Sequence, residues 1–255
     1  MSEFPFDPGS KQDEPPIPDC RYCRHRSNLL MSGRCVPGDI CVQANSNRQI
    51  DRFFRINMQY AEIYLRDDRW ERRAIAVRYA PVDALDRLIA DEDEAVRRAV
   101  AYRLPREALG ALIDDDDREV RITVADRLPL DKLEVMADDA DYLVRAYVAQ
   151  RLAPGRLFRF IRDPDLQVRK IVAKRLPEES LGLMISDPEP EVRRIIASRL
   201  MGEDLKQLLE DEDWTVRLEA VEHAPLSILE DLNESDDEVL NAIQRRKNHE
   251  KETSE

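Results

Sequence analysis

The feature that most constrains this chain is a repeat of 24 residues. The dipeptide Val-Arg recurs at that one interval, at Val96, Val120, Val144, Val168, Val192 and Val216. Two further columns keep the same register. They are the aspartates Asp67, Asp91, Asp115, Asp139, Asp163, Asp187 and Asp211, and the leucines Leu85, Leu109, Leu133, Leu157, Leu181, Leu205 and Leu229. We therefore predict seven units over residues 67–234 and a degenerate eighth unit with a charged tail over residues 235–255.

Each unit has the pattern of two short helices. In residues 91–114, Asp93 is placed to accept hydrogen bonds from the first turn of a helix. The apolar residues that follow share one face at 3.6 residues per turn: Val96, Ala99, Val100 and Leu104. Pro105 disfavours the α conformation at the residue before it and suits the first turn of a second helix. That second helix has a shorter apolar stripe, compatible with α or 3₁₀ geometry: Leu109, Leu112 and Ile113.

A pair of such short helices cannot bury its apolar face alone, whereas stacked pairs share one continuous core. The predicted fold class is therefore all-α, an α-solenoid superhelix of 24-residue two-helix repeats. The unit is shorter than the roughly 34 residues of a tetratricopeptide repeat and lacks the strand pattern of ordinary leucine-rich repeats.

All four cysteines precede the repeats, at Cys20, Cys23, Cys35 and Cys41, with the spacing C-x2-C-x11-C-x5-C. The chain contains no apolar run of the roughly 18 residues needed to cross a bilayer, and residues 1–19 form an acidic, proline-rich leader instead of a secretory signal. We therefore expect a cytoplasmic protein with no membrane partner. A reducing compartment argues against disulfides and favours a metal site.

The spacing of the four cysteines suits either a zinc ion or an iron–sulfur cluster, because thiolates are the ligands of both. Arginines outnumber acids in this segment, which supplies cations around an anionic centre of either kind. They are Arg21, Arg24, Arg26 and Arg34, against Asp39. Four unligated cysteines packed as a small core are disfavoured, because few other apolar residues accompany them.

Apolar residues at helical spacing follow the last cysteine: Ile50, Phe53, Phe54, Ala61, Tyr64 and Leu65, with Asn57 among them. They predict a helix that docks a domain of residues 20–66 onto the first repeat. Such a domain would cap the open end of the solenoid, and metal binding would supply the folding free energy that so small a core lacks.

The sequence resembles the leucine-rich repeat variant (LRV) protein family. The resemblance is carried by the 24-residue unit with D-x-D-x-x-V-R, by the A-x-R-L-P turn at residues 101–105, 125–129 and 173–177, and by the cysteine segment. It implies alternating α and 3₁₀ helices in a right-handed superhelix, a small N-terminal domain whose four cysteines hold a [4Fe-4S] cluster, and a setting in nitrogen-fixing bacteria. Departures from the repeat are Ala153 and Met201 for proline, Tyr79 and His223 for arginine, and Arg72 for valine.

Two arginine columns run through the units. Arg103 lies on the same helix face as Val96, so its side chain would be buried and require a partner. Its equivalents are Arg127, Arg151, Arg175 and Arg199. We predict pairing with the Asp91 column, with a ligand-binding stripe as the alternative. For the Arg97 column we expect a solvated network of ion pairs.

Trp70 and Trp214 occupy the same position in their units. Exposed tryptophans anchor protein partners, and packing of a first turn against a neighbour is the other interpretation.

No catalytic set emerges, since the chain has three histidines (His25, His223 and His249) and no phosphate-binding or hydrolase motif. We expect a non-enzymatic iron–sulfur scaffold that binds a protein partner, with a cluster of redox, sensing or structural role. The alternatives are an electron-transfer protein that delivers electrons to a docked partner, a zinc-capped scaffold and a nucleic-acid-binding solenoid. The net charge of −13 disfavours the last.

Overall fold

The computed structural model describes residues 18–230 and 232–253. Of the predicted leader, only Pro18 and Asp19 lie within these ranges. The chain divides into two compact units, Met1–Val124 and Ala125–Glu255, and each is considered by itself. In the part of the chain that the structure describes, no helix is both long and apolar enough to span a bilayer.

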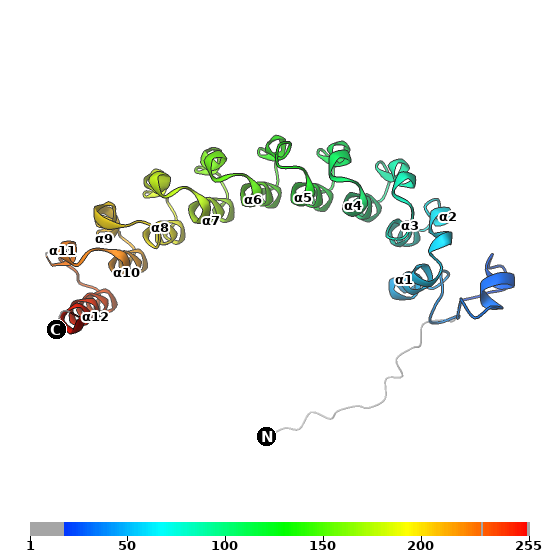
Figure 1. Ribbon diagram of the computed structural model, residues 1–255, viewed down its shortest axis with the longest axis horizontal. Coiled ribbons are helices and arrows are strands. Elements are labelled where there is room, and N and C mark those ends of the chain that lie inside the picture. The colour runs from blue at the N-terminus through cyan, green and yellow to red at the C-terminus, as the bar shows by residue number, and fades with distance from the viewer. Residues whose placement is uncertain (1–17, 231, 254–255) are drawn as a thin grey trace, which may run out of the picture. The chain divides into compact units, whose positions relative to one another are not determined.

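Each unit is built from α-helices that alternate with short 3₁₀ or single-turn α elements (Figure 1). Unit 1 contains η1 (Arg26–Leu30, a π-helical turn), α1 (Asn47–Ile56), η2 (Met58–Tyr60), α2 (Ala61–Tyr64), α3 (Trp70–Val77), η3 (Val82–Ala84), η4 (Asp86–Leu88), α4 (Glu94–Arg103) and η5 (Arg106–Leu112). Helix α5 (Arg118–Arg127) spans the division. Unit 2 contains η6 (Leu133–Met136), α6 (Tyr142–Arg151), η7 (Pro154–Phe160), α7 (Leu166–Arg175), η8 (Glu178–Met184), α8 (Pro190–Ala197), η9 (Gly202–Leu205), α9 (Lys206–Leu209), α10 (Trp214–His223), α11 (Leu226–Leu229) and α12 (Asp237–Thr253). The all-α solenoid of alternating α and 3₁₀ helices is confirmed.

The helix boundaries follow from the repeat sequence. The Asp93 side chain accepts a hydrogen bond from the Ala95 amide at 3.0 Å, which caps α4 as predicted. Helix α4 ends at Arg103, and the next residue, Leu104, has an extended ψ of 148°. Pro105 is also extended, with ψ of 145°, so it precedes η5 instead of opening its first turn as predicted. Two consecutive extended residues turn the chain from one helix row to the other.

The two turns that lack the proline are built differently. Ala153 keeps the extended conformation, with ψ of 143°, and Pro154 becomes the first residue of η7. At the other turn, Met201 is followed by Gly202 with φ of +65°, a left-handed conformation that favours glycine. The departure at Ala153 therefore shifts the proline by one residue, whereas the departure at Met201 changes the turn.

The core of each unit lies between its two rows of helices. In α4 and η5 the predicted stripe is almost fully buried, at Val96, Val100, Leu104, Leu109 and Leu112. Ala99 and Ile113 are half-buried at its edges. Consecutive α-helices contact one another, as α3 does α4 in unit 1 and as α7 does α6 and α8 in unit 2. The apolar face that each helix pair presents is thus covered by its neighbours.

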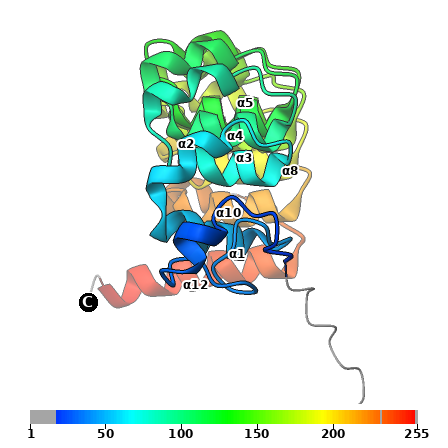
Figure 2. The same cartoon turned by 90° about the vertical axis from the view of Figure 1, so that its right-hand side faces the viewer.

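The segment that follows the cysteines packs onto the first repeat, as predicted, through two short helices instead of one. Asn57, with φ of −126° and ψ of 46°, separates α1 from η2 and α2. Both α1 and α2 contact α3. The apolar residues of the predicted docking face are all buried: Ile50, Phe53, Phe54, Ala61, Tyr64 and Leu65. The cysteine-bearing segment and η1 lie beside α1 at the N-terminal end of this unit (Figure 2).

Candidate functional site

The structure divides the four cysteines into two pairs by exposure. Cys35 and Cys41 are buried, at 4% and 1% exposure, whereas Cys20 and Cys23 are half-buried. All four are free thiols. The first pair belongs to a turn in which the Cys23 amide donates to the Cys20 carbonyl at 3.3 Å. One pair therefore lies inside the domain, and the other reaches its surface.

The second pair flanks a tight loop. The amide of Val36 donates to the Ile40 carbonyl, and the amide of Ile40 donates to the Val36 carbonyl, both at 2.9 Å. Gly38 has φ of +83°, which allows the chain to reverse between these two residues. This short bridge holds Cys35 and Cys41 at the two ends of one loop.

The four thiols fit an iron–sulfur cluster. Burial, followed by the charges of the other three cysteines, raises the pKa of Cys35 to about 12. Burial is also the main cause of the raised pKa values of Cys20 and Cys41. Once ionised, the thiols would repel each other, and iron would supply the opposing charge. In a [4Fe-4S] cluster, the four ligands Cys20, Cys23, Cys35 and Cys41 would each hold iron through sulfur.

A single zinc ion receives no support from the structure. A zinc site brings ligand sulfurs to about 2.3 Å from one ion. Across the described ranges, no three His, Cys, Asp or Glu side chains are grouped to hold one metal ion.

The arginines near the cysteines have different roles. Arg21 pairs with Asp19 at 2.7 Å. Arg34 donates to the Ile56 carbonyl at 2.9 Å and so reaches the C-terminal end of α1. Asp39, the acid within the segment, pairs with Arg52. Arg21 and Arg34 are thus engaged within the fold, and so is Asp39.

His25 is a buried residue of this domain that the sequence analysis left without a role. Its side chain is 2% exposed and packs against the rings of Phe53, Tyr60 and Tyr64. Nε2 lies 2.9 Å from the Tyr64 hydroxyl, and Nδ1 is buried without a hydrogen-bond partner. Burial, with a smaller contribution from Arg24, lowers the pKa of His25. Its position two residues after Cys23 was the available signal.

The departures of the first repeat occur where it meets the cysteine-bearing domain. Arg72, at the valine position, donates to Gln43 at 2.9 Å and to Asp67 at 3.3 Å. Tyr79, at the arginine position, donates its hydroxyl to Asp51 of α1 at 2.9 Å. The first repeat has no preceding repeat, so its side chains contact the N-terminal domain instead.

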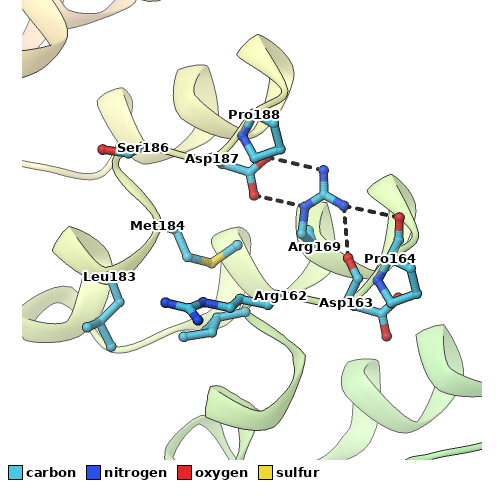
Figure 3. A pocket seen from close by; sticks show the side chains of 10 residues that line it. Arg162, Asp163, Pro164, Arg169, Leu183, Met184, Ser186, Asp187 and Pro188 are labelled. Atoms are coloured by element: carbon cyan, nitrogen blue, oxygen red, sulfur yellow. Dashed lines mark hydrogen bonds and ion pairs between the residues drawn. The ribbon is translucent and has the colours of Figure 1, made fainter.

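The predicted arginine ladder exists, but the Arg97 column forms it. Arg97 donates through Nε and Nη2 to the two carboxylate oxygens of Asp115 at 2.8 and 2.9 Å, and through Nη1 to the Asp91 carbonyl at 2.8 Å. The same arrangement recurs in Arg73 with Asp91, Arg145 with Asp163, Arg169 with Asp187, Arg193 with Asp211, and Arg217 with Glu234. These pairs are largely buried, so the prediction of a solvated network was wrong. Figure 3 shows Arg169 bonded on both sides.

The Arg103 column donates to backbone carbonyls instead of to the aspartates. Arg103 bonds the Val77 carbonyl at 2.9 Å and the Ala80 carbonyl at 3.1 Å, at the end of the preceding helix. Equivalent bonds join Arg151 to Ala125, Arg175 to Ala149, and Arg199 to Ala173. Position along the helix explains why Arg103 does not pair with the aspartates. The aspartates lie at the N-terminal ends of the helices and Arg103 at the other end, about 15 Å away in a 10-residue helix.

A pocket of about 510 Å³ is lined by the turn that precedes α7, by Arg169 of α7, and by the end of η8 with the turn that leads to α8. Its charged residues include Arg169, Asp163 and Asp187, which are bonded to one another or to backbone (Figure 3). The ladder therefore engages these three side chains, whereas Arg162, which also lines the pocket, is exposed.

Half-exposed aromatic residues recur at one position of the repeat, which we call the aromatic column. Trp70, Tyr142 and Trp214 are the first residues of α3, α6 and α10, with exposures of 40%, 38% and 43%. They are three repeats apart along the chain. Tyr142, which was not predicted, could have been found from the sequence, because it occupies the same repeat position as the two tryptophans. First-turn packing leaves all three partly open to solvent.

The comparisons with known proteins agree with this architecture. The family model for the LRV protein FeS4 cluster matches residues 17–63, and that for the leucine rich repeat variant matches residues 94–117 and 166–189. A solved structure described as a leucine-rich repeat variant with a novel repetitive protein structural motif is 70% identical to this chain. The likeness covers 90% of this chain and 98% of that one, with a TM-score of 0.87.

The chain belongs to the leucine-rich repeat variant family and carries the FeS4 cluster domain of that family. A relative from Rhodobacter capsulatus, an uncharacterized 27.7 kDa protein in the nifB 3′ region, is 41% identical over 87 residues. That match spans 34% of this chain and 35% of the relative, about a third of its length.

Proposed function

We propose that this chain is a non-enzymatic, cytoplasmic iron–sulfur protein whose repeats form a scaffold that binds another protein. In this proposal Cys20, Cys23, Cys35 and Cys41 hold a [4Fe-4S] cluster beside the first repeat. The free thiols are compatible with a reducing compartment. The name of the Rhodobacter relative suggests a setting near nitrogen fixation.

A protein partner fits the repeats better than a nucleic acid does. Residues 67–255 contain 31 lysines and arginines against 45 aspartates and glutamates. Both regular arginine columns are bonded within the fold, Arg97 to Asp115 and Arg103 to carbonyls. The arginines of these two columns, which could otherwise bind phosphates, are therefore already bonded to groups of the protein itself.

The observation that carries the scaffold proposal is the aromatic column. Tyrosine and tryptophan are enriched at the centres of protein interfaces, where they bury a large area at a small cost in conformational entropy. In unit 2, Tyr142 and Trp214 occupy this column, and the half-exposed Tyr147 lies on the same helix as Tyr142. These side chains are not fully buried by the fold, so they can anchor a partner on the α-helix row.

Capture of a partner tests the scaffold. Affinity capture from an extract of the source organism, with quantitative mass spectrometry, would compare wild type with the double variant Tyr142→Ala/Trp214→Ala. The matched control is Leu130→Ala/Val135→Ala, which removes exposed apolar side chains of unit 2 outside the α-helices. We expect the partner signal to fall about tenfold in the first variant and to persist in the control. Equal capture by all three proteins contradicts the scaffold surface.

Metal analysis tests the cluster. Protein purified without oxygen is expected to contain about four irons and four sulfides, with an absorption band that dithionite bleaches. One zinc and no iron would contradict the cluster half of the proposal.

Electron transfer is a second candidate function. The half-buried Cys20 and Cys23 favour it, because they bring part of the ligand set to the surface.

A further inference from the structure

The surface around Cys23 differs from the rest of the described molecule. A pocket of about 380 Å³ is lined there by Arg21, Tyr22, Cys23, Arg26, Ser27 and Met31. The pocket is lined by one predicted cluster ligand, Cys23, whereas Cys35 and Cys41 are buried. We call the side chains of Arg21, Tyr22, Arg26 and Met31 the Cys23 surface.

Large apolar side chains of the Cys23 surface are unusually open. Tyr22 is 92% exposed and Met31 is 79% exposed, the two highest values among the large hydrophobic residues that the structure describes. Aromatic residues and methionine are enriched at protein interfaces, and methionine adapts its shape to different partners. Two such side chains beside a ligand cysteine indicate a contact surface.

The charge of this region is opposite to that of the repeats. Residues 18–66 contain eight arginines against four acidic residues, whereas residues 67–255 have an excess of acid. Asp19, Asp39 and Asp51 of this region are paired with Arg21, Arg52 and Arg55, respectively. In the described part of the chain, Arg24 and Arg26 form no ion pair. An acidic partner is therefore attracted to this end and repelled by the repeats, which orients its approach.

We propose that the Cys23 surface docks an acidic electron-transfer protein. This inference rests on the proposed cluster and deepens the second candidate function by specifying where the partner binds and with what charge. Arginines would contact carboxylates around the partner's redox centre, and Tyr22 and Met31 would supply the apolar contact. That orientation brings the partner to the side of the domain that carries Cys20 and Cys23.

Binding of a small acidic [2Fe-2S] ferredoxin, used as the probe, tests the docking. The full chain, purified without oxygen, would be titrated by biolayer interferometry at about 50 mM and about 200 mM salt. We expect the Kd to rise about tenfold between these salt concentrations, and about tenfold in Arg26→Glu/Met31→Gln at the lower one. Tyr22→Ser is expected to weaken binding by a smaller factor.

Arg98→Glu/Tyr102→Ser on α4 is the matched control, because both residues are exposed and lie on a repeat. Its Kd should stay within about twofold of wild type. Iron content is measured for every variant, so that loss of the cluster is separated from loss of contact. Binding of a basic probe, cytochrome c, should not be weakened by the Arg26→Glu/Met31→Gln change.

Several outcomes would overturn the docking proposal. One is no ferredoxin binding at low salt, and another is equal binding by wild type and Arg26→Glu/Met31→Gln. A third is that a single-stranded DNA oligonucleotide binds this surface more tightly than the ferredoxin does. The fourth is that the chain forms a dimer that the Arg26→Glu/Met31→Gln variant converts to monomers. Protein that lacks iron would overturn the proposed cluster itself. Iron-loaded protein that does not bind the ferredoxin would overturn the docking proposal alone.

Discussion

The N-terminal domain and the repeats satisfy their buried polar groups in different ways. In the repeats, each ladder arginine donates through Nε and Nη2 to a carboxylate of the next repeat. Its Nη1 donates to backbone carbonyls of its own repeat. Within the described residues, three buried side-chain atoms have no hydrogen-bond partner: His25 Nδ1, Asn57 Oδ1 and Arg72 Nε. His25 and Asn57 belong to the N-terminal domain, and Arg72 belongs to the first repeat, where it bonds Gln43 of that domain. The repeats are stabilised by copies of one arrangement, whereas the N-terminal domain is the part expected to depend on a bound group.

The largest predicted effect follows from removing a cluster ligand. Cys35→Ser should abolish iron binding and destabilise the packing of α1 against α3, because metal binding supplies folding free energy to a small domain. Hydrogen exchange should accelerate about tenfold or more in α1 and α3 and stay unchanged in α7. Val36→Ser, an exposed neighbour in the same loop, is the control. Loss of iron with unchanged exchange in α1 would mean that the cluster does not stabilise the cap.

Breaking the ladder should have the next largest effect. Arg169→Ala leaves the Asp187 carboxylate buried without its cation, which is expected to cost about 3–5 kcal/mol. The shift in the urea midpoint of unfolding measures it, with the exposed Arg162→Ala as the control. The double variant Arg169→Met/Asp187→Leu should recover much of the loss, because no charge remains unpaired. A double variant as unstable as Arg169→Ala would show that packing, not charge, dominates at this position.

The end of the ladder predicts a dependence on pH. Its carboxylate is Glu234, whose hydrogen bonds from Arg217 hold its pKa below the usual value. Because the folded pKa is depressed, this contribution is complete above about pH 4.3 and is lost as the pH falls through the folded value.

Glu234→Gln should therefore lower stability by about 1.5–3 kcal/mol at neutral pH. Its difference from wild type should vanish in acid, as measured by urea unfolding from pH 7 to pH 3. Glu230→Gln, at an exposed position nearby, should follow the wild-type curve throughout. A difference that persists in acid would contradict a role for the charge.

The smallest predicted effect concerns a helix cap. Asp93→Ala removes the acceptor for the Ala95 amide and should destabilise unit 1 by about 1 kcal/mol. Glu92→Ala is the neighbouring control, since its side chain is 84% exposed and its ion pair with Arg73 lies at the surface. Thermal unfolding measures both variants. Equal effects would show that the cap adds nothing beyond a surface charge.

Much of the fold was predictable because it depends on local patterns. The 24-residue period, the aspartate cap and the proline after Leu104 each act within a few residues of chain, and each appears in the structure. The docking residues from Ile50 to Leu65 were also found, because burial of an apolar face follows from spacing alone. The break at Asn57 was missed, because it depends on hydrogen bonds from Asn57 to the carbonyls of Arg34 and Phe53.

The sequence by itself determined that the chain repeats, that each repeat pairs two short helices and that four cysteines precede the repeats. Only the tertiary structure decided which arginines pair with the aspartates. A helical projection places Arg103 on the buried face but does not show how far along the helix axis the residue lies. Its place at the C-terminal end of α4 brings its side chain to carbonyls of the preceding helix. The burial of His25 and the exposure of Tyr22 and Met31 were likewise decided there. Such contacts depend on how separate elements approach one another, and no spacing within one element specifies that distance.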